Sequence, residues 1–116
     1  MTIFGSTLTT PTVHTTPAPG FEWRPLWRIE PRPFDPALIR LCEEAVREET
    51  GDAPRLPSGP LHDAAEMVPH MPVVMMFAYS SNGLSHCKEE DTPEPYLLQT
   101  IEAFLRLVEN VASREC

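Results

Sequence analysis

The stretch PVVMMFAYSSNGLSHCKEED, residues 72–91, joins an apolar run directly to a polar loop. The apolar part, residues 72–79, is rich in β-branched and aromatic residues and does not alternate with polar ones. This composition is typical of a β-strand that is covered on both faces. Because ligands of open α/β sheets meet the loops at the carboxyl ends of strands, the loop 80–91 with His86 is the first candidate for a functional site.

A helix is predicted before this strand, in FDPALIRLCEEAVREETG, residues 34–51. Asp35 is a suitable N-cap, and Pro36 stands at the first helical position, where the missing N–H costs nothing. Gly51 supplies the left-handed residue that ends a helix. An apolar stripe follows the helical period and predicts that Cys42 lies in the core; it consists of Leu38, Leu41, Cys42 and Ala45.

A second helix is predicted after the loop, in TPEPYLLQTIEAFLRLVENVA, residues 92–112. Thr92 is its cap, Pro93 opens it, and Glu94 complements the positive end of the helix dipole. The apolar residues at helical spacing predict one wide buried face, formed by Leu97, Leu98, Ile101, Leu105 and Val108.

The remaining segments complete an α/β pattern. Residues 22–30 partly alternate and predict an edge strand, since Pro25 cannot donate a ladder hydrogen bond. A short helix is predicted over residues 62–68, before Pro69. The order strand, helix, short helix, strand, helix predicts one α/β layer over residues 21–116. Residues 1–20 are rich in Thr and Pro and are predicted to form a disordered tail.

Length and charge exclude several classes of protein. The 116 residues suffice for one small domain. A net charge of −8 and the lack of a basic stripe argue against nucleic acid as a partner. The sequence holds no apolar run of the roughly 18–20 residues that span a membrane, and no secretion signal is recognisable. Three cysteines without spaced pairs predict reduced thiols and a cytoplasmic protein.

Two histidines stand beside turn residues in chemically suggestive contexts. His86 follows Gly83 and Ser85 in the loop, where a neutral imidazole suits a metal ligand or a general base. A helix-cap or surface histidine is the alternative interpretation. His62 follows the turn residues Ser58-Gly59-Pro60, and Asp63 beside it is equally explained as an acidic residue at a helix N-terminus.

The local signal for a self-contained metal site is weak. Catalytic zinc takes three protein ligands and a water. Suitable donors are His62, Asp63, His70, His86, Cys87, Glu89, Glu90 and Asp91, but none of them belongs to an HExxH or CxxC pattern. His86 and Cys87 are adjacent on an extended loop, so their side chains are expected to point apart.

Three stretches together, RLPSGPLHDAAEM, PVVMMFAYSSNGLSH and KEEDTPE, resemble the C-terminal end of the zinc-dependent amidohydrolases of the hydantoinase/carbamoylase branch. This group includes N-carbamoyl-L-amino-acid hydrolases, allantoate amidohydrolases and β-alanine synthases, and is related to the aminoacylases and di-zinc exopeptidases. The resemblance runs from about Phe21 to Val111. It implies a partial catalytic domain of a di-zinc exopeptidase-like hydrolase.

The resemblance also implies roles for individual residues. His86 matches the histidine of the family's G-[IL]-S-H motif, which ligates one of two active-site metals. The turn of residues 58–63 matches S-G-x-x-H-D-A, which lies against the substrate and binds its carboxylate through backbone groups. Gly59, Leu61 and His62 would then be substrate-binding residues, with Leu61 where many members have glycine. No residue of the chain matches a catalytic acid or base.

The rest of the family's site has no counterpart in this sequence. Its other metal ligands and its lid domain are expected ahead of residue 21, where the Thr/Pro-rich segment stands instead. The complete enzymes use a divalent metal such as Zn or Mn to cleave amide or carbamoyl bonds of small molecules, and are often homodimers. This chain is expected to be inactive alone and to hold no metal tightly. A non-catalytic remnant or small interaction module is the alternative, and exposed apolar surface would favour self-association.

Overall fold

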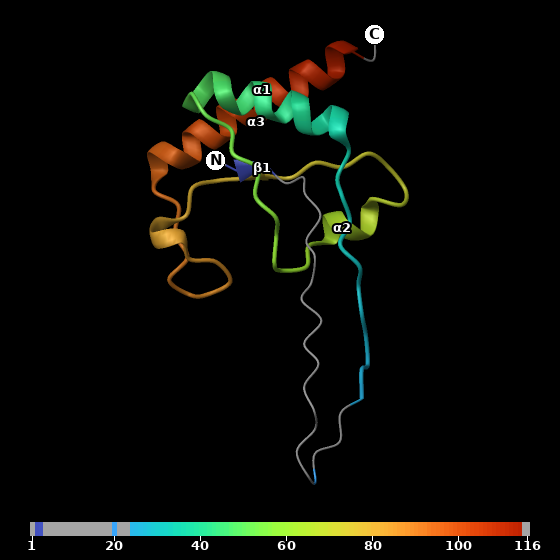
Figure 1. Cartoon of the computed structure of the whole chain (residues 1–116). Coiled ribbons are helices and arrows are strands. Elements are labelled where there is room, and N and C mark those ends of the chain that lie inside the picture. Colours follow the sequence, from blue (N-terminus) through green and yellow to red (C-terminus); the bar gives the residue numbers. More distant parts are fainter. Residues whose placement is uncertain (1, 4–19, 21–23, 115–116) are drawn as a thin grey trace.

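The structure, a computed structural model, describes residues 2–3, 20 and 24–114 of the chain. Its elements in chain order are β1 (Thr2–Ile3), α1 (Pro36–Thr50), α2 (Asp63–Met67), β2 (Met76–Phe77), a 3-10 turn η1 (Ser81–Gly83) and α3 (Glu94–Arg114). Figure 1 shows α1 and α3 crossing on one side of the molecule, with α2 and the loops on the other. None of the helices in the described ranges is long and apolar enough to cross a membrane.

Helix α1 begins and ends where its sequence predicts. The Asp35 carboxylate accepts hydrogen bonds from the backbone N–H groups of Ala37 and Leu38, at 2.9 and 2.8 Å. Gly51 has φ 81° and donates its N–H to the carbonyl oxygen of Arg47. The cap bonds satisfy N–H groups that a helix start leaves without partners. The predicted short helix is also confirmed, as α2.

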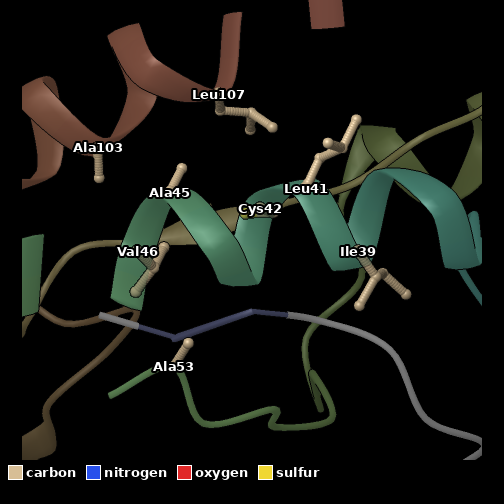
Figure 2. Close-up of a cluster of buried hydrophobic side chains, with 8 residues drawn as sticks. All are labelled: Ile39, Leu41, Cys42, Ala45, Val46, Ala53, Ala103 and Leu107. Atoms are coloured by element: carbon tan, nitrogen blue, oxygen red, sulfur yellow. The ribbon is translucent and has the colours of Figure 1, made fainter. Parts of the chain in front are cut away.

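The core lies between α1 and α3 (Figure 2). Its buried side chains are Ile39, Leu41, Cys42, Ala45, Val46, Ala53, Ala103 and Leu107. Cys42 is fully buried, as the apolar stripe predicts, and burial raises the pKa of its thiol to about 11. Most of these residues come from α1, so one well-capped helix supplies the centre of the fold.

Helix α3 buries a different face from the predicted one. The five residues expected to be buried, Leu97, Leu98, Ile101, Leu105 and Val108, are between 45% and 55% exposed. Ala103 and Leu107 pack against α1 instead. On the same side Gln99 donates a hydrogen bond to the Glu49 carbonyl oxygen, and Arg106 pairs with Glu48 at 3.1 Å and with Glu49. The small side chain of Ala103 permits the close approach, and the polar anchors fix which face is used.

The predicted strands are shorter than expected. Of residues 72–79 only Met76–Phe77 are a strand, and their side chains are half-buried. This strand pairs antiparallel with β1, in the register Thr2 to Phe77 and Ile3 to Met76. Two residues of the segment predicted to be a disordered tail therefore form a strand, while residues 1 and 4–19 lie outside the described residues.

The predicted edge strand at residues 22–30 is wrong for its described part. Residues 24–30 form no strand, and Leu26 and Trp27 are largely exposed. Residues 22–23 lie outside the described residues. Alternating side chains predict a strand only where a neighbouring strand supplies backbone partners, and no described strand lies against this segment. The fold is consequently more helical than the α/β pattern predicts.

Candidate functional site

The two histidines singled out by their motifs lie near each other in the fold. The ring centroids of His62 and His86 are 6.1 Å apart. His62 directly precedes α2, and His86 lies in the loop between η1 and α3. Phe77 of β2 contacts His62 edge to face, with ring centroids 5.5 Å apart. The strand thus carries an aromatic ring to the place where the two motifs meet.

His62 is held by the turn that precedes it. The Ser58 hydroxyl oxygen lies 2.8 Å from Nε2 of His62 and donates a hydrogen bond to the Pro60 carbonyl oxygen at 3.0 Å. His62 occupies the N-cap position of α2, but its side chain makes no cap bond to the helix. The imidazole is therefore oriented by Ser58 and Phe77 and is half-buried.

His86 is exposed in a compact loop. Its φ is 58°, and Asn82 and Gly83 also have left-handed backbone conformations. The His86 N–H donates to Oε2 of Glu90 at 2.8 Å, which ties the histidine backbone to the end of the loop. Ser81 donates its N–H to the Asp91 carbonyl oxygen at 2.8 Å and so closes the base of the loop. Histidine tolerates the left-handed region better than bulky or β-branched residues do.

The other substrate-binding candidates line the turn before α2. Gly59 is exposed, and a Cβ added to it would meet nothing within 4 Å, so the space beside its backbone is open. Leu61 is also exposed. Both flank the Ser58 and His62 pair in sequence. The open backbone at Gly59 is accessible to a ligand.

The metal donors do not converge in the described part of the chain. No group of three or more His, Cys, Asp or Glu side chains that could hold a metal ion occurs among these residues. His70 and Cys87 are exposed, and Lys88 lies 3.5 Å from Glu89. Two imidazoles do not fit a catalytic zinc, which takes three protein ligands. We therefore assign no metal-dependent step to these residues alone.

Two contributions to the site were missed by sequence reasoning. Ser58 was read as a turn residue and Phe77 as part of a buried strand. The spacing of Ser58 and His62, four residues apart across a Gly-Pro bend, is compatible with a hydrogen bond, but it does not distinguish that bond from an ordinary turn. The contact of Phe77 with His62 depends on tertiary packing and leaves no local signal.

Comparisons with known proteins agree with this picture. A family model described as peptidase family M20/M25/M40 matches residues 2–110. The crystal structure of an amidase of the hydantoinase/carbamoylase family from Burkholderia phymatum is similar, with 29% sequence identity and a TM-score of 0.64. The match covers 73% of this chain and 20% of that one, so this chain spans about a fifth of the amidase. No curated protein matches significantly. The predicted resemblance to the hydantoinase/carbamoylase group is confirmed.

Proposed function

The chain belongs to peptidase family M20/M25/M40, and from this premise we propose that it carries the C-terminal part of the active site of a hydrolase that cleaves C–N bonds. The proposed substrates are N-carbamoyl amino acids or related small ureido compounds. The observation that carries the proposal is the 6.1 Å separation of the His62 and His86 rings, because it joins the two sequence motifs into one site.

Each site residue has a distinct proposed role. His86 offers an exposed imidazole and would supply one ligand to a divalent metal, Zn or Mn, in the complete site. His62 would contact the substrate, oriented by its bond to Ser58. The backbone beside Gly59 and Leu61 would bind the substrate carboxylate, which needs N–H donors and open space.

The isolated chain is proposed to be inactive. The described residues offer two imidazoles at the site and no third metal ligand beside them. No described carboxylate stands close enough to these rings to complete a metal site or serve there as a base. Zinc titration by calorimetry and an ammonia-release assay with N-carbamoyl amino acids test this. We expect neither tight stoichiometric binding nor turnover.

A chimera tests the site directly. Residues 24–114 replace the matched fifth of the Burkholderia amidase, and hydrolysis of N-carbamoyl amino acids is measured together with bound metal. We expect turnover that His86→Ala abolishes together with part of the metal content. His70→Ala is the matched control, since this exposed histidine lies outside the site, and it should leave both unchanged.

Two results would contradict the proposal. A folded chimera that retains its metal and turnover after His86→Ala would remove His86 from the metal site. A folded chimera that binds metal but hydrolyses no amide or carbamoyl compound would favour the non-catalytic alternative. Tight zinc binding by the isolated chain, lost in His86→Ala and accompanied by turnover, would show that Glu89, Glu90, Asp91 or a second copy completes the site.

A further inference from the structure

Helix α3 is apolar on two sides, and only one of them is covered. Ala103 and Leu107 face α1 and are buried. The outer face of α3, as we define it, consists of Leu97, Leu98, Ile101, Phe104, Leu105 and Val108, all between 45% and 55% exposed. These positions recur at helical spacing and lie on one side of the helix, away from Ala103. A helix that is apolar on opposite sides is typically buried on both.

The outer face continues into an apolar groove of about 570 Å³. Val108 and Ala112 of α3 line one wall of this groove. Met67, Met71 and Val73, in the connection from α2 to β2, line the other. The uncovered surface thus extends from the middle of α3 to the chain that leads into β2. Contiguous exposed apolar surface of this extent marks an interaction site.

The short sheet beside this surface is also incomplete. Among the described residues β2 pairs with β1 alone, over two residues of each strand. A two-stranded pairing is at best marginally stable without further strands or helix packing. A free strand edge pairs readily with another strand. Helix face and strand edge therefore call for the same occupant, a sheet that adds to β2 and packs beneath α3.

The comparison with the amidase decides which polypeptide that is. This chain superimposes on a fifth of the amidase with a TM-score of 0.64, and four fifths of that chain have no counterpart here. A second copy of this chain would bring another net charge of −8 to the interface. We propose that the outer face of α3 is the docking surface for the remaining part of an M20-type catalytic domain. The proposal rests on the family match and not on the proposed activity.

Co-expression tests the docking surface. The full chain, carrying an affinity tag, is produced together with the four fifths of the Burkholderia amidase that lie outside the match. We expect a 1:1 complex by light scattering, with slower amide hydrogen exchange in α3 and β2 than in the isolated chain. Ile101→Asp and Leu105→Asp should abolish co-purification. Both side chains are half-exposed, so circular dichroism of the isolated variants should be unchanged.

Glu109→Gln is the matched control, because Glu109 is exposed on α3 and lies outside the outer face. It should co-purify like the unmodified chain. Absence of the complex, or a complex that survives both aspartate variants, overturns the proposal. A homodimer of the isolated chain that Leu105→Asp dissociates assigns the face to a second copy and overturns it as well. A complex without hydrolytic activity supports the docking surface and counts only against the proposed function.

Discussion

The hydroxyl oxygen of Ser58 lies between Nε2 of His62, at 2.8 Å, and the carbonyl oxygen of Pro60, at 3.0 Å. A hydroxyl has one proton to donate and can accept hydrogen bonds as well. Because a carbonyl oxygen can only accept, the Ser58 proton goes to Pro60. Nε2 of His62 must then carry a hydrogen and donate it to Ser58. The turn thereby selects one tautomer of the imidazole.

We predict that neutral His62 is the Nε2–H tautomer and that Ser58→Ala releases this preference. Nitrogen-15 chemical shifts of the ring report the tautomer directly. Ser85→Ala is the control, since Ser85 is exposed in the loop before His86. A His62 ring protonated at Nδ1 in the unmodified chain, or shifts unaffected by Ser58→Ala, would contradict the prediction.

The packing of α3 predicts unequal effects for two neighbouring leucines. Leu107→Ala should lower the free energy of unfolding by about 2–5 kcal/mol, because Leu107 is buried against α1 and truncation leaves a cavity. Leu105→Ala should cost about 1 kcal/mol or less, because Leu105 is half-exposed. Urea denaturation of both variants measures the difference. The reverse order would mean that α3 packs by its outer face.

The burial of Cys42 predicts slow chemistry at its thiol. Its pKa is raised from 9.0 to about 11, chiefly by burial and further by the Glu43 charge. In a Cys116→Ser background, a thiol reagent at pH 8 should label the exposed Cys87 quickly and Cys42 only after unfolding. Equal labelling rates in the native chain would show that the core opens readily.

The same raised pKa makes stability depend on alkaline pH. Between pH 9 and 11 the unfolded thiol loses its proton while the folded one retains it. The contribution of this group is therefore complete below pH 9 and is lost as pH rises through 11. Cys42→Ala should reduce the loss of stability over this interval, measured by urea denaturation at each pH. An unchanged slope would exclude Cys42 as its source.

The Glu43 and Arg55 pair predicts an acid-dependent effect. A side-chain hydrogen bond from Arg55 is the main cause of the lowered pKa of Glu43, aided by the charges of Arg47 and Arg40. A lowered carboxyl pKa stabilises the fold above the unfolded value of 4.5 and is lost as pH falls through the folded value. Arg55→Gln should therefore destabilise the chain at pH 7, and the difference should shrink below pH 4.5. A difference constant from pH 7 to pH 3 would contradict this.

Several parts of the fold follow from local sequence. The bounds of α1 depend on Asp35, Pro36 and Gly51, whose cap bonds involve residues at most four positions away. The turn before α2 and the loop around His86 are local in the same way. The motifs also identified the two histidines as site candidates, and the resemblance implied that both belong to one site.

The strands and the buried face of α3 did not follow from sequence. The apolar run at residues 72–79 does not encode which backbone it pairs with, and only Met76–Phe77 meet a partner. Helix α3 has apolar residues on two sides, so its periodicity alone favoured the wrong face. Large side chains weighed most in that prediction, whereas Ala103 is the residue that lies against α1.

The sequence by itself determined the caps and length of α1, the position of α2 and the chemistry of the two histidine motifs, because these depend on neighbouring residues. Only the tertiary structure decided that α3 meets α1 through Ala103 and Leu107, and that His62, Phe77 and His86 come together. Packing selects one helix face by its fit to a partner surface, with polar anchors such as Arg106 to Glu48 aligning the pair. That fit is a property of two segments at once, and neither segment encodes it alone.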